Sequence, residues 1–230
     1  MSVLELQQVT KTFGSGNTEV KALKETSFNA ERGELIAIIG PSGSGKSTFL
    51  TISGGLQAPT TGRVIVNGED LTELNEKKRA KVRLHEIGFV LQASNLVPFL
   101  NVKQQMELTN RVKDDNLSKE FADELYKILG IQDFLHKLPS DLSGGQRQRV
   151  AIAKALYGDP SIILADEPTA SLDSDKAFEV MQLLKEATTE RGKTTIVVTH
   201  DTRLVSYCDK VYHIVDGELS EAEHEDVARS

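Results

Sequence analysis

The sequence predicts an α/β fold in which a largely parallel sheet is flanked by helices and interrupted by an inserted helical subdomain. Three observations lead to this prediction. Short apolar runs of strand length alternate with helical patterns near both ends of the 230 residues. One such run, at residues 34–39, leads directly into a glycine-rich loop and then a helical pattern. Between residues 93 and 157 clear strands disappear and helical patterns take over.

Each expected element follows from its own periodicity and from the turn residues beside it. The apolar runs predict strands at 4–9, 22–28, 34–39, 63–66, 88–91, 162–165, 194–199 and 210–215. The helical patterns lie at 46–53, 75–85, 119–129, 146–156 and 174–190. We therefore assign 1–230 to one domain, with a catalytic α/β core at 1–92 and 158–230 and a helical subdomain at 93–157. Since little sequence follows the last expected strand, we expect no regulatory domain there.

Composition and charge narrow the class of protein. The net charge of −7, from 27 basic and 34 acidic residues, argues against general binding to the nucleic-acid backbone. No apolar run approaches the roughly 20 residues that span a bilayer, and the first residues do not resemble a secretory signal. The single cysteine, Cys208, rules out an intrachain disulfide, and the histidines show no metal-ligand spacing. These features predict a cytoplasmic chain.

Two segments of the chain concentrate charge of one sign. The basic run Lys77-Lys78-Arg79, continued by Lys81 and Arg83, is expected to be a solvated helix face. A patch near anionic lipid head groups is the alternative. The acidic segment 221–226 is expected to fray.

The first glycine-rich loop fits the pattern G-x-x-x-x-G-K-[ST] and predicts a phosphate-binding P-loop. Its glycines allow consecutive N–H groups to point at an anion, and the helix that follows adds the positive end of its dipole. Lys46 would reach the β- and γ-phosphates of a nucleotide, and Ser47 would ligate Mg²⁺. The candidate ATP-binding residues of this loop are Gly40, Pro41, Ser42, Gly43, Ser44, Gly45, Lys46, Ser47 and Thr48.

Two carboxylates follow the apolar strand expected at 162–165. Asp166 would hold Mg²⁺, through water, and Glu167 would act as general base on the attacking water. Alone, this pattern fits a helix-capping acid equally well. Because it follows a P-loop in the chain, the catalytic interpretation is favoured.

A second glycine-rich segment, Leu142-Ser143-Gly144-Gly145-Gln146, lies at the start of an expected helix. An N-cap with a glycine turn is one interpretation, and a second site for a γ-phosphate is the other. These five residues match the signature of ATP-binding-cassette (ABC) ATPases, so the chain resembles that family. The resemblance implies a P-loop NTPase (RecA-like) core with the inserted helical subdomain and a small N-terminal antiparallel β-subdomain. It also implies that the signature faces the P-loop of a second subunit, with two ATP molecules between the subunits of a head-to-tail homodimer.

Other landmarks of the resemblance fall in order along the chain. Gln92 resembles the Q-loop glutamine that senses the γ-phosphate and metal, and His200 the switch histidine that contacts the γ-phosphate. Phe13 stands where the family places an aromatic that stacks on adenine, although core packing is an alternative. Ser171, Leu172 and Asp173 resemble the D-loop at the dimer interface. The resemblance thus gives catalytic roles to Lys46, Gln92, Glu167 and His200, and metal-binding roles to Ser47, Gln92 and Asp166.

Longer stretches resemble one branch of the family. Residues 163–169 with 171–173 are similar to macrolide and lipoprotein exporters of the MacB and LolD type. Residues 88–100 are similar to ATPases of hemin exporters and antimicrobial-peptide resistance transporters. Residues 53–57 and 177–180 favour the hemin-exporter type. The resemblance implies ATP and Mg²⁺ as cofactors, an integral-membrane permease as partner, no nucleic acid, and a place at the cytoplasmic face of the cell membrane. Antimicrobial-peptide or lipoprotein export, or an FtsE-like motor that moves no cargo, are the alternatives within this branch.

Two further expectations concern partners and class. The apolar Leu96, Val97, Phe99 and Leu100, within residues 92–103, would form part of a docking groove for the permease, or would pack in the helical subdomain. A soluble ABC ATPase of DNA repair or translation is disfavoured, because the chain is acidic and lacks coiled coils and a second cassette. An unrelated P-loop kinase or GTPase is disfavoured by the signature and by His200.

Overall fold

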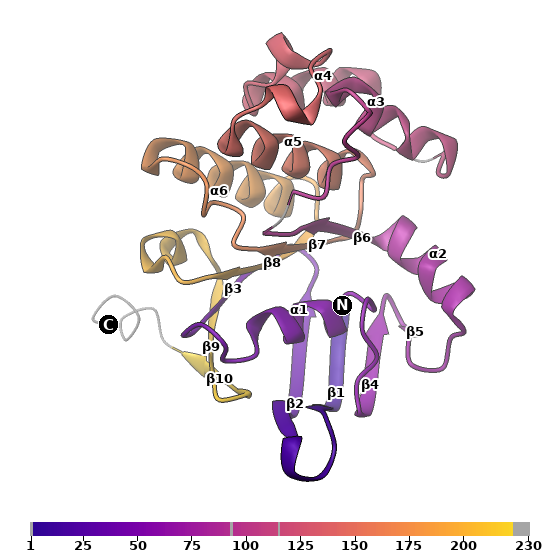
Figure 1. Ribbon diagram of the computed structural model, residues 1–230, viewed down its shortest axis with the longest axis vertical. Helices are drawn as coiled ribbons and strands as arrows, with labels where there is room; N and C mark the ends of the chain where they lie inside the picture. Colours follow the sequence, from indigo (N-terminus) through magenta and orange to yellow (C-terminus); the bar gives the residue numbers. More distant parts are fainter. Residues whose placement is uncertain (1, 93, 115, 223–230) are drawn as a thin grey trace.

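The computed structural model describes residues 2–92, 94–114 and 116–222, and contains the expected mixed α/β core (Figure 1). Its main sheet has the strand order β10-β9-β3-β8-β7-β6. Strands β9, β3, β8, β7 and β6 are parallel, whereas β10 pairs antiparallel with β9 at one edge. The strands are β3 (Leu35–Ile39), β6 (Ile87–Val90), β7 (Ile162–Asp166), β8 (Thr194–Thr199), β9 (Lys210–Val215) and β10 (Glu218–Ala222).

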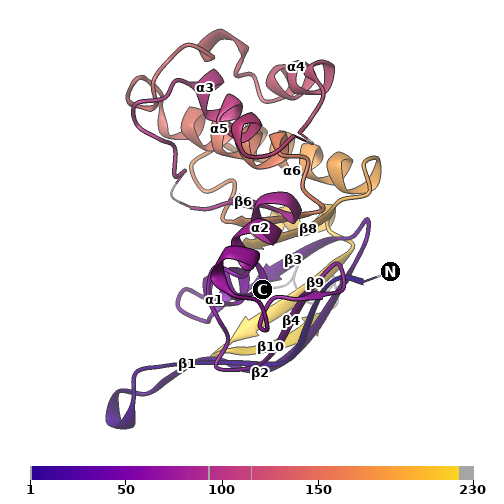
Figure 2. The ribbon, with the colours of Figure 1, turned by 90° about the vertical axis from the view of Figure 1, so that its right-hand side faces the viewer.

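A second, antiparallel sheet has the order β2-β1-β4-β5. Its strands are β1 (Ser2–Phe13), β2 (Val20–Glu31), β4 (Thr61–Val66) and β5 (Glu69–Asp70). This sheet confirms the small N-terminal antiparallel β-subdomain. The long β1–β2 hairpin, which extends from the body in Figure 2, carries polar positions and bulges that hid its full length from the sequence pattern.

The alternation of side chains along the buried strand β3 divides the core into two clusters. Ile36 and Ile38 face the antiparallel sheet and helix α1 (Lys46–Ser53), whose Phe49 and Leu50 are fully buried there. Leu35, Ala37 and Ile39 face the opposite cluster, which includes helices α5 (Gly144–Tyr157) and α6 (Ser174–Thr189). The main sheet is therefore covered on both faces, as its continuous apolar strands require.

The helical part of the chain lies over the α5 side of the sheet (Figures 1 and 2). It contains α3 (Val102–Glu107) and α4 (Lys119–Ile128), and α2 (Glu76–Glu86) lies beside β6. Short 3-10 turns are η1 (Gly16–Thr18), η2 (Thr109–Arg111), η3 (Gln132–Phe134), η4 (Pro139–Asp141) and η5 (Thr202–Tyr207). Residues of α4 and α5 belong to the same buried cluster as β3 and β8, so the division at 93–157 stays a prediction. No helix within the described ranges is long and apolar enough to cross a membrane.

Besides the 3-10 turns, two strands and one helix of the described residues were not expected from the sequence. The strands β5 and β10 are mostly polar and exposed, and α3 has only six residues, so none carries a clear apolar period. Glu221 and Ala222 pair with β9, so fraying of the acidic segment is wrong for these two residues. The remainder of that segment, 223–226, lies outside the described residues, as does His224.

Candidate active site

The loop between β3 and α1 has a backbone that its glycines make possible. Gly40 has φ of +158° and Gly45 has φ of +108°. A Cβ atom on Gly40 would lie 2.1 Å from the carbonyl oxygen of Ile214, and one on Gly45 would lie 2.3 Å from that of Ala22. Gly45 caps α1 without a side-chain hydrogen bond, which leaves N–H groups of the first helical turn for an anion.

The side chain of Lys46 lies against its own loop. Its Nζ atom donates hydrogen bonds of 2.8 Å to the carbonyl oxygens of Gly40 and Pro41. The ammonium group is thereby held at the mouth of the loop, where the phosphates of a nucleotide would offer it stronger, charged acceptors.

One open cavity of about 630 Å³ brings together most of the predicted site. Its lining residues are Ala22, Gly40, Pro41, Ser42, Gly43, Gly45, Lys46, Ser47, Thr48, Gln92, Asp166, Glu167, Ala170 and His200. Ser44 does not line it, because this residue is buried beneath the loop, where its carbonyl accepts a hydrogen bond from the Gly217 amide. Sequence reasoning missed the support of the loop by the β9–β10 turn and the presence of Ala22 and Ala170 in the cavity wall, since no local pattern marks either.

Asp166 ends β7 beside the start of α1. Burial raises the pKa of its carboxyl, and the charge of Glu167 adds to this effect, whereas a hydrogen bond from Ser47 and the charge of Lys46 oppose it. The described residues hold no cluster of three or more His, Cys, Asp or Glu side chains suited to a metal. The oxygen donors of Ser47, Asp166 and Gln92 instead fit Mg²⁺, which takes few protein ligands and completes its shell with water and phosphate.

Glu167 and His200 are paired across the ends of β7 and β8. The Nδ1 atom of His200 lies 2.7 Å from Oε1 of Glu167, and Thr199 donates its hydroxyl proton to Oε2 at 3.3 Å. Glu167 adopts φ of +49°, a left-handed backbone that a non-glycine residue rarely adopts. Its side chain is 13% exposed and that of His200 is 72% exposed, so the carboxylate is held in place beside an accessible imidazole. This strained, oriented carboxylate is suited to abstract a proton from water.

The signature segment lies in a different cavity. Ser143 caps α5 and accepts a hydrogen bond from the Gln146 amide at 3.2 Å, while the Gln146 side chain accepts one from the Ser143 amide at 2.8 Å. The N-cap expected as an alternative is therefore present, and Ser143 and Gly144 are also exposed. Gly144 lines the second cavity together with Gln92, Ser94, Asn95, Leu96, Pro139, Arg147, Gln148 and Ser171. Leu142 is buried beneath this cap.

The D-loop lies against the signature. A Cβ atom on Gly145 would lie 3.1 Å from the Ser171 carbonyl oxygen and 3.2 Å from Cδ2 of Leu172. Asp173 accepts a hydrogen bond from the Lys176 amide and so caps α6. The structure brings these two segments together but does not bring the signature to the P-loop cavity of the same chain.

Phe13 is not brought to the described cavity. It lies at the end of β1 opposite Val20, is 40% exposed, and has Lys11 Nζ at 5.1 Å from its ring centroid. Core packing of Phe13 is therefore wrong, because the ring is too exposed, and adenine stacking stays a prediction.

A glycine-rich anion loop with its lysine, a hydroxyl–carboxylate pair and an oriented general base together define a P-loop ATPase site. The chain belongs to the ABC transporter family, whose family model matches residues 23–170. It is an ATP-hydrolysing cassette with ATP and Mg²⁺ as its cofactors.

Curated relatives match nearly the whole chain. The "Putative hemin import ATP-binding protein HrtA" of Staphylococcus haemolyticus is 43% identical over 219 residues, which are 94% of this chain and 98% of that protein. The protein of the same name from Staphylococcus aureus is 41% identical over 220 residues, 95% of this chain and 99% of its own.

Solved structures agree with this fold. The dimeric ATP-binding cassette MJ0796, in a post-hydrolysis state bound to ADP and Pi, superposes with a TM-score of 0.89 at 41% identity. The match covers 96% of this chain and 98% of that one. CbiO1 of Clostridium perfringens, part of the transporter complex cbiONQ, has a TM-score of 0.81 at 31% identity and covers 100% and 91% of the two chains.

Proposed function

We propose that this chain is the ATPase subunit of a membrane exporter, works as a homodimer bound to an integral-membrane permease, and drives the export of hemin. The single observation that carries the catalytic part is the cavity in which Lys46, Asp166 and the Glu167–His200 pair meet. The partner and the cargo rest on further arguments given below.

In the proposed reaction, the loop amides and Lys46 bind the β- and γ-phosphates of ATP, and Ser47 with Asp166 holds the metal ion. Bound Mg²⁺ supplies charge neutralisation for the transferred phosphoryl group. Glu167 accepts a proton from the attacking water, and His200 orients Glu167 through their contact. Positioning and electrostatic stabilisation supply the catalysis, without a covalent intermediate.

The homodimer proposal rests on the separation of two glycine-rich segments. Ser143 and Gly144 lie at an exposed helix N-terminus, which is an anion-binding arrangement, yet neither lines the cavity of Lys46, and Gly144 lines a different one. A second copy, turned head to tail, would supply the signature to each P-loop. The similar cassette MJ0796 is described as dimeric.

A permease docking site is proposed between α2, β6 and α5. A groove of about 420 Å³ there is lined by Leu84, Phe89, Ala151 and neighbouring residues. In the adjoining segment Phe99 is 77% exposed, whereas Leu96 packs against the buried core cluster. Core packing therefore accounts for Leu96, and Phe99 is the better candidate for contact with the permease. If Phe99→Asp preserves ATP binding and still assembles normally with the permease, docking through Phe99 is wrong.

The cargo and its direction come from resemblance and not from the site, because the ATPase touches no cargo. The curated relatives are named for hemin import, whereas residues 88–100 resemble hemin exporters. ATP-driven hemin accumulation in inside-out membrane vesicles containing chain and permease would support export. ATP-driven hemin accumulation in right-side-out vesicles loaded with ATP would instead indicate import.

The partner itself is tested by isolating the tagged chain from detergent-solubilised membranes and identifying bound proteins by mass spectrometry. A permease with four membrane helices and a large extracellular domain supports a MacB-type exporter. A partner that regulates cell-wall hydrolases would favour the FtsE-like motor. ATPase activity that is stimulated by antimicrobial peptides or lipoproteins, and not by hemin, would favour the other export classes.

Two variants test the catalytic assignment: Glu167→Gln tests the general base, and Lys46→Ala tests the phosphate-binding lysine. The glutamine variant should bind ATP normally, lose at least a hundredfold in turnover, and accumulate as an ATP-bound dimer in size-exclusion chromatography. The alanine variant should lose ATP binding or hydrolysis. Normal turnover by the Glu167→Gln variant would rule out Glu167 as the general base.

A further inference from the structure

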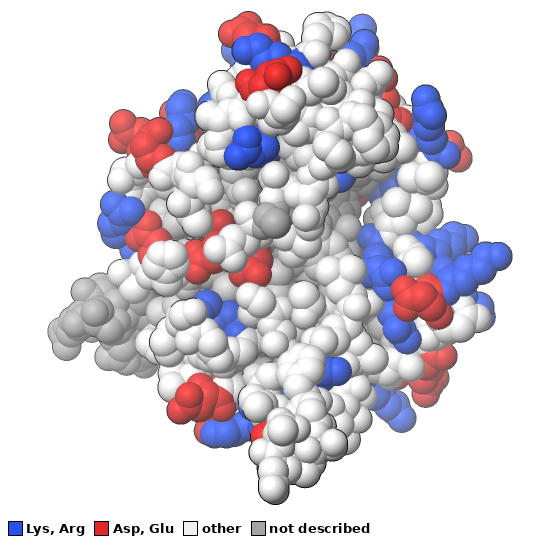
Figure 3. Space-filling model, viewed as in Figure 1, with Lys and Arg blue, Asp and Glu red and all other residues white. Residues whose placement is uncertain are grey.

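Helix α2 concentrates positive charge on a chain of net charge −7. Five of its eleven residues are Lys or Arg, and Figure 3 shows basic side chains gathered over this edge of the molecule. These basic residues are Lys77, Lys78, Arg79, Lys81 and Arg83. The structure divides them into two groups with different environments.

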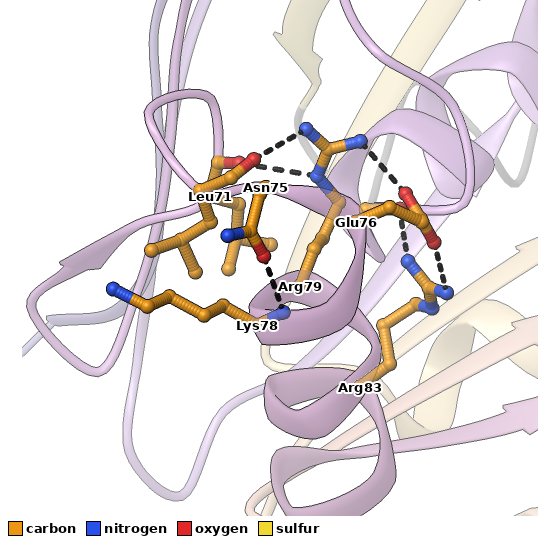
Figure 4. A network of polar contacts seen from close by, with 8 residues as sticks. Leu71, Asn75, Glu76, Lys78, Arg79 and Arg83 are labelled. Carbon is orange, nitrogen blue, oxygen red and sulfur yellow. Dashed lines mark hydrogen bonds and ion pairs between the residues drawn. The ribbon is translucent and has the colours of Figure 1, made fainter.

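The two arginines are structural (Figure 4). Glu76 lies between them, with Oε2 at 3.1 Å from Arg79 and Oε1 at 2.7 Å from Arg83. Arg79 also donates hydrogen bonds to the carbonyl oxygens of Leu71 and Leu74. Arg83 donates a hydrogen bond of 2.8 Å to the carbonyl oxygen of Gly55. The hydrogen bond from Arg83 lowers the pKa of the Glu76 carboxyl, and both oxygens of this carboxylate are paired with the arginines.

The three lysines are different. Lys77, Lys78 and Lys81 are exposed, and no carboxylate among the described residues lies within ion-pairing distance of their ammonium groups. Lys77 and Lys81 stand four residues apart on the helix, an arrangement in which like charges repel. These lysines, which we call the lysine face, therefore weaken α2 slightly as long as no anion is near them.

The lysine face adjoins the groove proposed for the permease. Ala80, Arg83 and Leu84 of α2 line that groove, and Leu84 is 37% exposed. Leu56, which is 47% exposed, lines the groove as well. Figure 2 shows α2 in front of the main sheet on this side of the molecule. A permease in the groove would bring the lysine face toward the membrane in which that permease is embedded.

We propose that the lysine face binds the anionic head groups of the bilayer when the ATPase is docked on its permease. Long, flexible lysine chains suit a diffuse array of phosphate charges, whereas a defined carboxylate partner would favour the fixed geometry of arginine. The exposed Leu84 and Leu56 add apolar surface at the same edge, as at other interfacial helices. This inference rests on the proposed membrane partner, and its test is independent of that partner.

The test is co-flotation of the full chain with large unilamellar vesicles at several millimolar lipid. Vesicles of phosphatidylcholine are compared with equimolar phosphatidylcholine and phosphatidylglycerol, at low and high salt. The expected result is binding to the anionic vesicles only, reduced at high salt. Each lysine at an anionic surface contributes about fivefold, so the variant K77Q/K78Q/K81Q should lose roughly a hundredfold in partition coefficient.

The matched control is K119Q/K127Q/K137Q, which removes three exposed lysines elsewhere and changes the net charge equally. Glutamine keeps the helix propensity of lysine, and binding of a fluorescent ATP analogue confirms that each variant is folded. The proposal would be overturned if both variants lost vesicle binding equally, or if K77Q/K78Q/K81Q lost none. So would unchanged flotation combined with lost binding to the detergent-solubilised permease, which would make the lysine face a protein interface. Because ATP binding and Glu167→Gln turnover are measured separately, failure here leaves the ATPase assignment testable.

Discussion

Replacing Gln105 with leucine should loosen the segment that carries Phe99 without disturbing the nucleotide cavity. Gln105 is fully buried in α3, and its side chain makes three hydrogen bonds to that segment. Oε1 accepts a bond from the Val97 amide at 3.1 Å, and Nε2 donates bonds of 2.7 Å and 2.9 Å to the carbonyl oxygens of Val97 and Leu100.

The magnitude follows from these three bonds. Each contributes about 1 kcal/mol net, and an abandoned backbone group costs more when water cannot reach it. Val97 and Leu100 are half-buried, so water restores part of the loss, and we expect about 2 kcal/mol for local opening of the segment. That corresponds to roughly a thirtyfold faster hydrogen exchange at the Val97 amide.

Hydrogen exchange followed by mass spectrometry measures this directly, and the exposed Gln132→Leu serves as control. ATP binding should be unchanged, because Gln105 does not line the nucleotide cavity. Exchange at residues 97–100 that is identical in the wild type and Gln105→Leu would refute the reasoning, as would an equal rise throughout the domain.

Three other predictions concern buried or paired groups. Lys113 is 3% exposed and donates hydrogen bonds to the carbonyl oxygens of His85 and Gly158. Lys113→Met should therefore lower the free energy of unfolding by about 2 kcal/mol in urea titrations, and unchanged stability would show that these bonds do not stabilise the fold. Burial raises the pKa of the Cys208 thiol to about 12, so iodoacetamide at pH 8 should label it slowly until urea unfolds the chain, and rapid labelling of native protein would disprove its burial. Hydrogen bonds from Arg203 lower the pKa of Asp201, so their stabilisation is present above about pH 4 and is lost as pH falls through the lowered value. Arg203→Gln should therefore weaken the dependence of Tm on pH in this acidic range, and an identical acid limb would count against the pair.

The sequence predicted those elements whose residues act locally. The apolar strands β3, β7 and β8 and the helices α1 and α5 carry strong periodicity, and each lies beside a glycine- or acid-containing motif. Their positions followed from local pattern alone. The observed α1 begins and ends at the expected residues 46 and 53.

The elements that were missed depend on distant partners. β10 has one apolar residue with a large side chain, Leu219, and exists because β9 offers it an open edge. Lys113 is polar in sequence yet buried, since the backbone carbonyls of two distant residues, His85 and Gly158, accept hydrogen bonds from it. A polar residue whose partner lies tens of positions away has no local sequence pattern that marks it as buried. Such long-range hydrogen bonds are therefore seen only in the tertiary structure.

Residues of the segment that follows β6 line the nucleotide cavity, the cavity of Gly144 and the groove proposed for the permease. Gln92 lines the nucleotide cavity and also the cavity of Gly144. Ser94 and Asn95 line that second cavity and also the groove proposed for the permease. Because interfaces repack between discrete arrangements, a shift of Gln92 toward a bound phosphate would displace its near neighbours at the groove. We therefore expect ATP binding to be coupled to the proposed permease through Gln92, Ser94 and Asn95, and Gln105 anchors the far end of this segment.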